Sequence, residues 1–130
     1  MTDSKRVTNT VHIHTAGELH PAPEVQADIT LNLSRLLSNP AHVLPERLRS
    51  LDGTDGRVED LVFATPGAKD VYRGLVELLD SALGHGKDVT VLILCRGGKH
   101  RSVAFGENLA HDFSTTATHH HKDLPVVKPA

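Results

Sequence analysis

The 130-residue sequence has no tryptophan, and its aromatic residues amount to only 3%. A surface that stacks many nucleic-acid bases on aromatic rings is therefore largely excluded. Long apolar runs are also missing, and without about 18 consecutive apolar residues we expect no membrane-spanning helix. A chain of this length has room for one domain with a single core, which must be built from Leu, Val, Ile and Ala.

Cysteine occurs once, at Cys95. A lone cysteine excludes an intrachain disulfide and a cysteine-based zinc cluster, and it points to a reducing compartment. The opening residues MTDSKRVTNT contain no apolar stretch of the signal-peptide type, which predicts a cytoplasmic protein. No pattern in the sequence indicates a resident cofactor.

Neither sign of charge dominates, because 14 Lys and Arg stand against 16 Asp and Glu for a net charge of −2. This balance is not the signature of a non-specific nucleic-acid binder. The ten histidines are unusual, since each has an ordinary pKa of about 6.5. Anion binding that uses His100 or the run His119 to His121 should therefore strengthen as the pH falls below about 7.

We expect one domain over residues 7–124, with a flexible N-terminus at 1–6 and a tail at 125–130. The expected strands are 7–15, 27–33, 89–94 and 115–120, and the expected helices are 57–64, 69–83 and 100–113. Residues 34–56 are loop-rich, and a connection of this length is more often a binding loop than filler. Because 89–94 reads VTVLIL, we expect a central strand buried on both faces. The fold class predicted is α/β, a single layered domain with a mixed, partly parallel sheet flanked by helices.

A glycine-containing loop follows the VTVLIL strand and precedes a predicted helix. Its two glycines allow backbone N–H groups to turn toward a ligand, and the helix start adds unpaired donors and partial positive charge. Several cationic side chains lie beside these donors, and arginine can bind two phosphate oxygens at once. We expect a phosphate-binding loop made by Gly97, Gly98, Lys99, His100, Arg101 and Ser102. The alternative is a solvated basic turn in which the glycines only allow the backbone to turn tightly.

The same loop also matches the C-x5-R-S spacing of cysteine phosphatases, with Cys95 as nucleophile and Arg101 as the phosphate-binding residue. Those enzymes usually carry histidine before the cysteine, where this sequence has Leu94. The alternative for Cys95 is a small apolar residue that closes a buried strand. A Walker-type loop is not supported, because Ile93 and His100 replace its glycine and its Ser or Thr.

Three consecutive histidines, His119 to His121, end the last predicted strand. Neighbouring residues of a strand alternate faces, so at most two of them can share a metal ion, and we expect no metal site. A solvated or RNA-facing basic edge is the favoured interpretation. The candidate RNA-binding residues are Arg96, Lys99, His119, His120, His121 and Lys122.

The pattern Cys95-x-Gly97-Gly98-x-His100-Arg101-Ser102-Val103 resembles the signature of the RapZ C-terminal domain family of RNase adapter proteins. Collinear segments support the resemblance over residues 7 to 124: Val11-x-Ile13 with Gly17, Asn39-Pro40, Gly53-x-Asp55 and His121-Lys122-Asp123. The sequence departs from the family's pattern in its Asn-Pro loop, where His42 is displaced by one residue and no Trp follows. The separate nucleotide-binding domain that precedes the motif in longer members has no counterpart here.

The resemblance implies a non-catalytic, regulatory domain that binds a phosphorylated metabolite, in the best-known case glucosamine-6-phosphate, and that presents RNA to a ribonuclease. Its ligand pocket would include Gly97, Gly98, His100, Arg101 and Ser102, with His42 contributed by the Asn-Pro loop. The expected partners are a phosphorylated small molecule and RNA, without a membrane, and the formation of a homo-oligomer is left open. The alternatives are a cysteine phosphatase, and a nucleotide- or RNA-binding module without a small-molecule ligand.

Overall fold

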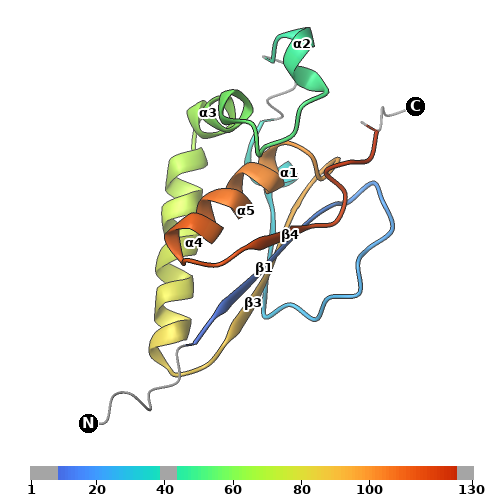
Figure 1. Ribbon diagram of the computed structural model, residues 1–130. Coiled ribbons are helices and arrows are strands. Elements are labelled where there is room, and N and C mark those ends of the chain that lie inside the picture. Colours follow the sequence, from blue (N-terminus) through green and yellow to red (C-terminus); the bar gives the residue numbers. More distant parts are fainter. Residues whose placement is uncertain (1–8, 39–43, 126–130) are drawn as a thin grey trace.

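The computed structural model describes residues 9–38 and 44–125 as an α/β fold around one four-stranded sheet (Figure 1). The strand order is β2-β3-β1-β4, and every pair of neighbours is parallel. The strands are β1 (Val11–Gly17), β2 (Ile29–Asn32), β3 (Val89–Cys95) and β4 (Ala117–His119). The α/β class and the central position of β3 are therefore confirmed. Within the described residues the sheet is wholly parallel, whereas only partial parallel pairing was expected.

Helices cover one face of the sheet, and the long segment between β1 and β2 runs along the other side (Figure 1). The helices are α1 (Leu33–Leu36), α2 (Glu46–Arg49), α3 (Gly56–Ala64), α4 (Ala68–Gly84) and α5 (Arg101–Asp112). β3 shows the consequence, because Val91 and Ile93 are fully buried while Leu92 and Leu94 are only half-buried. The prediction that this strand is buried on both faces is thus wrong, since no helix of the described chain packs on its second face.

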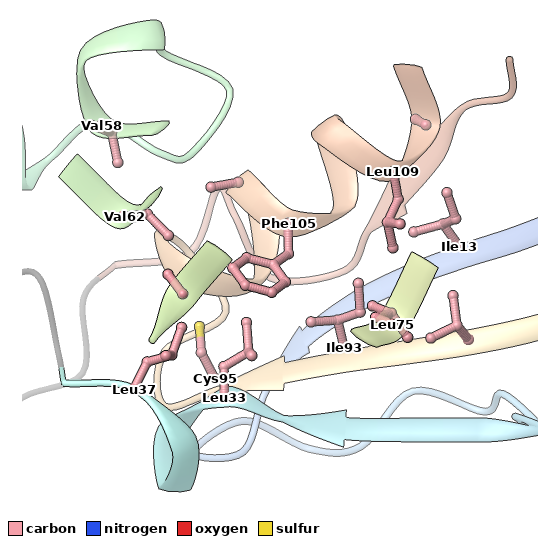
Figure 2. Close-up of a cluster of buried hydrophobic side chains, with 14 of the residues drawn as sticks. Ile13, Leu33, Leu37, Val58, Val62, Leu75, Ile93, Cys95, Phe105 and Leu109 are labelled. Carbon is pink, nitrogen blue, oxygen red and sulfur yellow. The ribbon is translucent and has the colours of Figure 1, made fainter. Parts of the chain in front are cut away.

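The core lies between the helix-covered face of the sheet and α3, α4 and α5 (Figure 2). Phe105 is its largest fully buried side chain, and its ring stacks on Phe63 with centroids 5.0 Å apart. Tyr72 closes the cluster edge-on to both rings. Most of the few aromatic residues therefore pack together where α3, α4 and α5 meet, and aliphatic side chains fill the rest of the core.

The three longer predicted helices are present within one residue of their expected ends. α3 begins where expected because the Asp55 side chain caps it, accepting a hydrogen bond from the Arg57 N–H. The segment 34–56, by contrast, contains α2 and all of α1 except Leu33, where the predicted strand 27–33 gives way to helix, and both helices are four residues long and too short to produce a helical period. No helix of the described chain is long and apolar enough to cross a membrane.

Candidate functional site

The candidate site lies where β1 and β3 end side by side, at Gly17 and Cys95. From this edge the chain leaves the two strands in different directions. β1 continues into the segment that leads to β2, whereas β3 continues into α5 on the helix-covered face (Figure 1). In open parallel sheets, ligands bind outside the carboxyl ends of the strands where such connections diverge.

Gly17, at the end of β1, lies against Gly97 and Gly98, which follow β3. We call these three residues the glycine crossing. A Cβ on Gly17 would lie 2.4 Å from the carbonyl carbon of Gly97, and one on Gly98 would lie 2.5 Å from the nitrogen of Gly17. Gly98 also has a φ of +72°, in the left-handed region that favours glycine. Gly97 differs, because nothing lies within 4 Å of its Cβ position. The fold requires Gly17 and Gly98, and Gly97 faces open space.

A run of backbone donors follows the crossing. Among the described residues, none of the N–H groups from Gly97 to Val103 finds an acceptor. The first N–H groups of a helix have no partner within the helix, and they carry its positive partial charge. His100, the residue before α5, makes no side-chain cap, and the first turn of α5 contains no acidic residue. The start of α5 thus combines unsatisfied donors with positive potential, a combination suited to an anion.

The cationic side chains of His100 and Arg101 point into the protein. His100 is 8% exposed, and its Nε2 lies 3.0 Å from the Arg49 carbonyl oxygen, to which it donates. Arg101 is 3% exposed, and its Nη1 donates to the Leu37 carbonyl oxygen at 2.9 Å. Burial is the main cause that lowers the pKa of both groups. These side chains fasten α1 and α2 to the loop, while their backbone N–H groups stay in the donor run.

The remaining loop residues divide between surface and core. Arg96 is exposed, and the half-buried Lys99 donates from Nζ to the Lys122 carbonyl oxygen at 2.9 Å. Ser102 is fully buried, and its Oγ accepts a bond from the Cys95 thiol at 3.2 Å. Cys95 is itself 2% exposed and belongs to the apolar core (Figure 2). The C-x5-R-S spacing therefore places the thiol inside the packed side chains.

Two further residues complete the surroundings of the loop. Gly53 donates its N–H to the Lys99 carbonyl oxygen at 2.8 Å, and a Cβ there would lie 2.4 Å from the nitrogen of Ala104. Its position against α5 was not predicted, since a turn glycine gives no signal of a distant backbone contact. His42, the histidine expected from the Asn-Pro loop, lies outside the described residues.

The histidine run lies along β1 rather than facing outward. His119 bridges Thr15 Oγ1 at 2.7 Å and the Glu107 carboxylate at 2.6 Å. His120 Nε2 lies 2.9 Å from His14 Nδ1. His121 is 8% exposed, and its Nδ1 accepts the Gly17 N–H at 2.8 Å. These internal contacts differ from the solvated or RNA-facing edge that the sequence suggested, because each ring binds a neighbour within the fold.

Metal binding finds no support in the described part of the chain, which contains no group of three or more potential ligands placed around one point. His12 and His14 share one face of β1, and with Thr90 and the segment Glu24 to Gln26 they line a shallow cavity. His12 Nε2 instead lies 3.5 Å from the Asp88 carboxylate at the surface.

Comparison with known proteins adds relatives of greater length. A "Nucleotide-binding protein" of Lactobacillus helveticus is 36% identical over 117 residues, which are 86% of this chain and 39% of that protein. A protein of the same description from Streptomyces griseus is 43% identical over 91 residues, 66% of this chain and 27% of the relative. The chain thus spans less than half the length of these relatives.

The family comparison covers the domain itself. The family model described as RapZ C-terminal domain matches residues 9–125. This range contains the whole sheet, the glycine crossing and the donor run. The chain therefore belongs to the RapZ C-terminal domain family.

Proposed function

We propose that this domain binds a phosphorylated small molecule at the glycine crossing, as a regulatory binding domain rather than as an enzyme. The observation that carries the proposal is the run of N–H groups from Gly97 to Val103, which has no acceptor in the described chain. Charge-assisted hydrogen bonds from such donors are about twice as strong as neutral ones. A phosphate dianion offers the oxygen acceptors that these donors lack.

Side chains around the crossing support the same ligand class. Arg96 is exposed and Lys99 half-buried at the loop. Arg101 uses only Nη1 toward acceptors of the described chain, so Nε and Nη2 remain as donors. Gly97 leaves open space where a ligand would approach the backbone.

The position of the thiol argues against the cysteine-phosphatase alternative. A nucleophilic cysteine must present its sulfur to the substrate, whereas Cys95 is 2% exposed and bonded to Ser102. Within the proposed class, a sugar phosphate such as glucosamine-6-phosphate is the first ligand to test, because the family resemblance implies it. A nucleotide is the second, because relatives that are more than twice as long are called nucleotide-binding proteins.

A titration followed by amide NMR tests the site. Inorganic phosphate, glucosamine-6-phosphate and ATP would be added in turn to the labelled chain. We expect shifts at the amides of residues 97–103 and Gly17, strongest for the ligand of the correct class. No saturable shift at these amides with any of the three would contradict the proposal.

A matched pair of variants locates the binding surface. Gly97→Ala keeps the backbone N–H but adds a methyl group in the open space where the ligand would approach, so the chain should fold but bind the anion about tenfold or more weakly. Gly74→Ala makes the same change on the exposed side of α4, where nothing lies within 4 Å, and should bind like wild type. Equal affinity of the two variants would contradict the assigned surface.

The RNA adapter role is a further proposal that rests on the resemblance. Arg96 is the exposed cation nearest the loop, since Lys122 lies 3.0 Å from Asp123 and the three histidines bind within the fold. RNA affinity should therefore fall with Arg96→Ala and show a steep dependence on salt. Binding of a small RNA that is unaffected by Arg96→Ala would place the RNA surface elsewhere.

A further inference from the structure

The segment after β4 is fastened to the carboxyl end of β1 by two imidazoles. His120 donates its backbone N–H to the Thr15 carbonyl oxygen at 2.9 Å, and its ring Nε2 lies 2.9 Å from His14 Nδ1. The rings of His14 and His120 stack with centroids 5.2 Å apart. His121 Nδ1 accepts the Gly17 N–H at 2.8 Å. The last described residues therefore meet β1 at the glycine crossing.

Each of these side-chain bonds requires a nitrogen without a proton. Nδ1 of His121 can accept the Gly17 N–H only through its lone pair, so the ring must be neutral there. The contact between His14 and His120 needs one N–H and one lone pair, so the two facing nitrogens cannot both be protonated. Full protonation of the rings therefore replaces the acceptor nitrogen of each contact by a second N–H group, and in both contacts two N–H groups then face each other. His119 makes a different contact, because its Nε2 lies 2.6 Å from the Glu107 carboxylate and not against another imidazole.

We propose that His14, His120 and His121 form a proton-operated latch that holds residues 120–124 on the end of β1 and releases them when the imidazoles are protonated. The geometry supports this, since the Gly17 contact needs a neutral His121 ring and the contact between His14 and His120 is lost once both facing nitrogens are protonated. Release frees the Gly17 N–H and removes the segment that lies beside the crossing. The latch is independent of whether an anion binds there.

Burial and the neighbouring imidazoles favour the neutral, closed state. Several titratable or charged groups face the latch. His12 and Glu24 lie beside His14, and His20 lies against His121. Asp88 contacts His12, and the segment that is released is flanked by Lys99, Lys122, Asp52 and Asp123. Burial is the largest cause that lowers the pKa of His14 and of His121, and neighbouring imidazoles lower both further. Both rings thus take up protons more readily when the latch is open.

The direction of the pH effect follows from this difference. The closed latch is fully stable above the ordinary histidine pKa of about 6.5 and weakens as the pH falls below it. For each proton taken up on opening, the opening equilibrium constant rises about tenfold per pH unit in that range. Local opening of this kind is visible as loss of amide exchange protection.

Amide hydrogen exchange on the full chain tests the latch without any ligand. Exchange at Gly17 and His120, corrected for the intrinsic rate, would be measured from pH 7.5 to 5.5, with Val91 in the centre of β3 as the internal reference. We expect protection of Gly17 and His120 to fall about tenfold per pH unit below about 6.5, while Val91 stays protected. Constant protection of Gly17 over this range would overturn the proposal.

A non-titrating substitution separates the latch from a general effect of acid. His121→Asn keeps an acceptor oxygen near the position of Nδ1 but cannot be protonated, so the fall in Gly17 protection should disappear. His85→Asn removes an exposed histidine at the far end of α4 and should leave the fall unchanged. A fall that persists in His121→Asn would contradict the proposal.

Ring NMR keeps the test decisive if His121→Asn does not fold. In the wild-type chain, protonation of the His14 and His121 rings should coincide with loss of protection at Gly17. Rings that become charged while the Gly17 amide stays protected would overturn the latch.

Discussion

Gly17 and Gly98 come so close that neither has room for a side chain: a Cβ on Gly17 would lie 2.6 Å from the nitrogen of Gly98, and a Cβ on Gly98 would lie 2.5 Å from the nitrogen of Gly17. Real Cβ contacts are essentially never this short. The contact joins the ends of the two central strands and so fixes where the donor run of residues 97–103 begins.

Gly98→Ala should therefore destabilise the fold strongly. The left-handed φ of +72° costs about 1–2 kcal/mol for a non-glycine residue, and the backbone overlap adds to this cost. Urea denaturation would measure the change in the free energy of unfolding.

Gly74→Ala is the control for this substitution. It replaces an exposed glycine in the middle of α4 and should raise the free energy of unfolding by about 0.5–1 kcal/mol. If both variants shift the free energy of unfolding in the same direction, the crossing is not as close as described.

Arg101→Lys tests the anchoring role of the guanidinium. Lysine keeps the charge but cannot reproduce the planar fork that reaches Leu33 and Leu37. A buried carbonyl left without its donor costs about 1–3 kcal/mol in the free energy of unfolding. Arg35→Lys, an exposed change on the neighbouring helix α1, should have almost no effect. Equal stability of both variants would show that Arg101 does not hold α1 in place.

Sulfate binding should strengthen as the pH falls below about 6.5. His14 and His121 have a lowered pKa in the folded chain, so acid favours opening of the latch, and opening frees the Gly17 N–H beside the donor run. The sign agrees with the strengthening that the sequence suggested, but the cause differs, because His100 and His121 face inward. Calorimetry with sulfate, which keeps its charge over this range, would separate protein titration from ligand titration. Affinity that stays constant or falls from pH 7.5 to 5.5 would contradict this coupling.

Tyr72 should remain protonated well above its ordinary pKa of about 10. Burial raises the pKa of Tyr72 most, and its hydrogen bond to the Asp112 carboxylate raises it further. Because the sequence contains one tyrosine, ultraviolet absorbance at alkaline pH reports this group alone. The stabilising contribution is present below pH 10 and is lost as the pH rises above that value. Asp112→Asn should lower the midpoint, and a wild-type midpoint near 10 in the folded chain would contradict the contact.

The sequence was most informative where a local pattern determines the structure. The VTVLIL run predicted the central strand, and the pattern of residues 57–64 predicted α3, because apolar patterns act over a few residues. The glycine loop between β3 and α5 was located for the same reason. Its proposed role in binding stays a prediction.

Features that depend on distant contacts could not be read in the same way. Arg101 and His100 were recognised as cations beside the loop, but the direction of a side chain depends on the carbonyl groups of Arg49 and Leu37, which belong to short helices without a visible period. The pairing of the histidine run with β1 joins residues 104 positions apart, such as Thr15 and His119. Nothing near either residue indicates its partner.

The parallel order of the sheet also determines when the site can form during synthesis. β1 is made first, yet its neighbours are β3 and β4, whose residues follow it by dozens to more than a hundred positions. A growing chain that ends before residue 117 has β1 as an open edge, with unpaired N–H and C=O groups available to other chains. It also lacks the ring that binds Gly17. The Gly17 N–H therefore gains its His121 acceptor only after the last strand has been made, and the long-range pairs of the sheet are expected to form slowly.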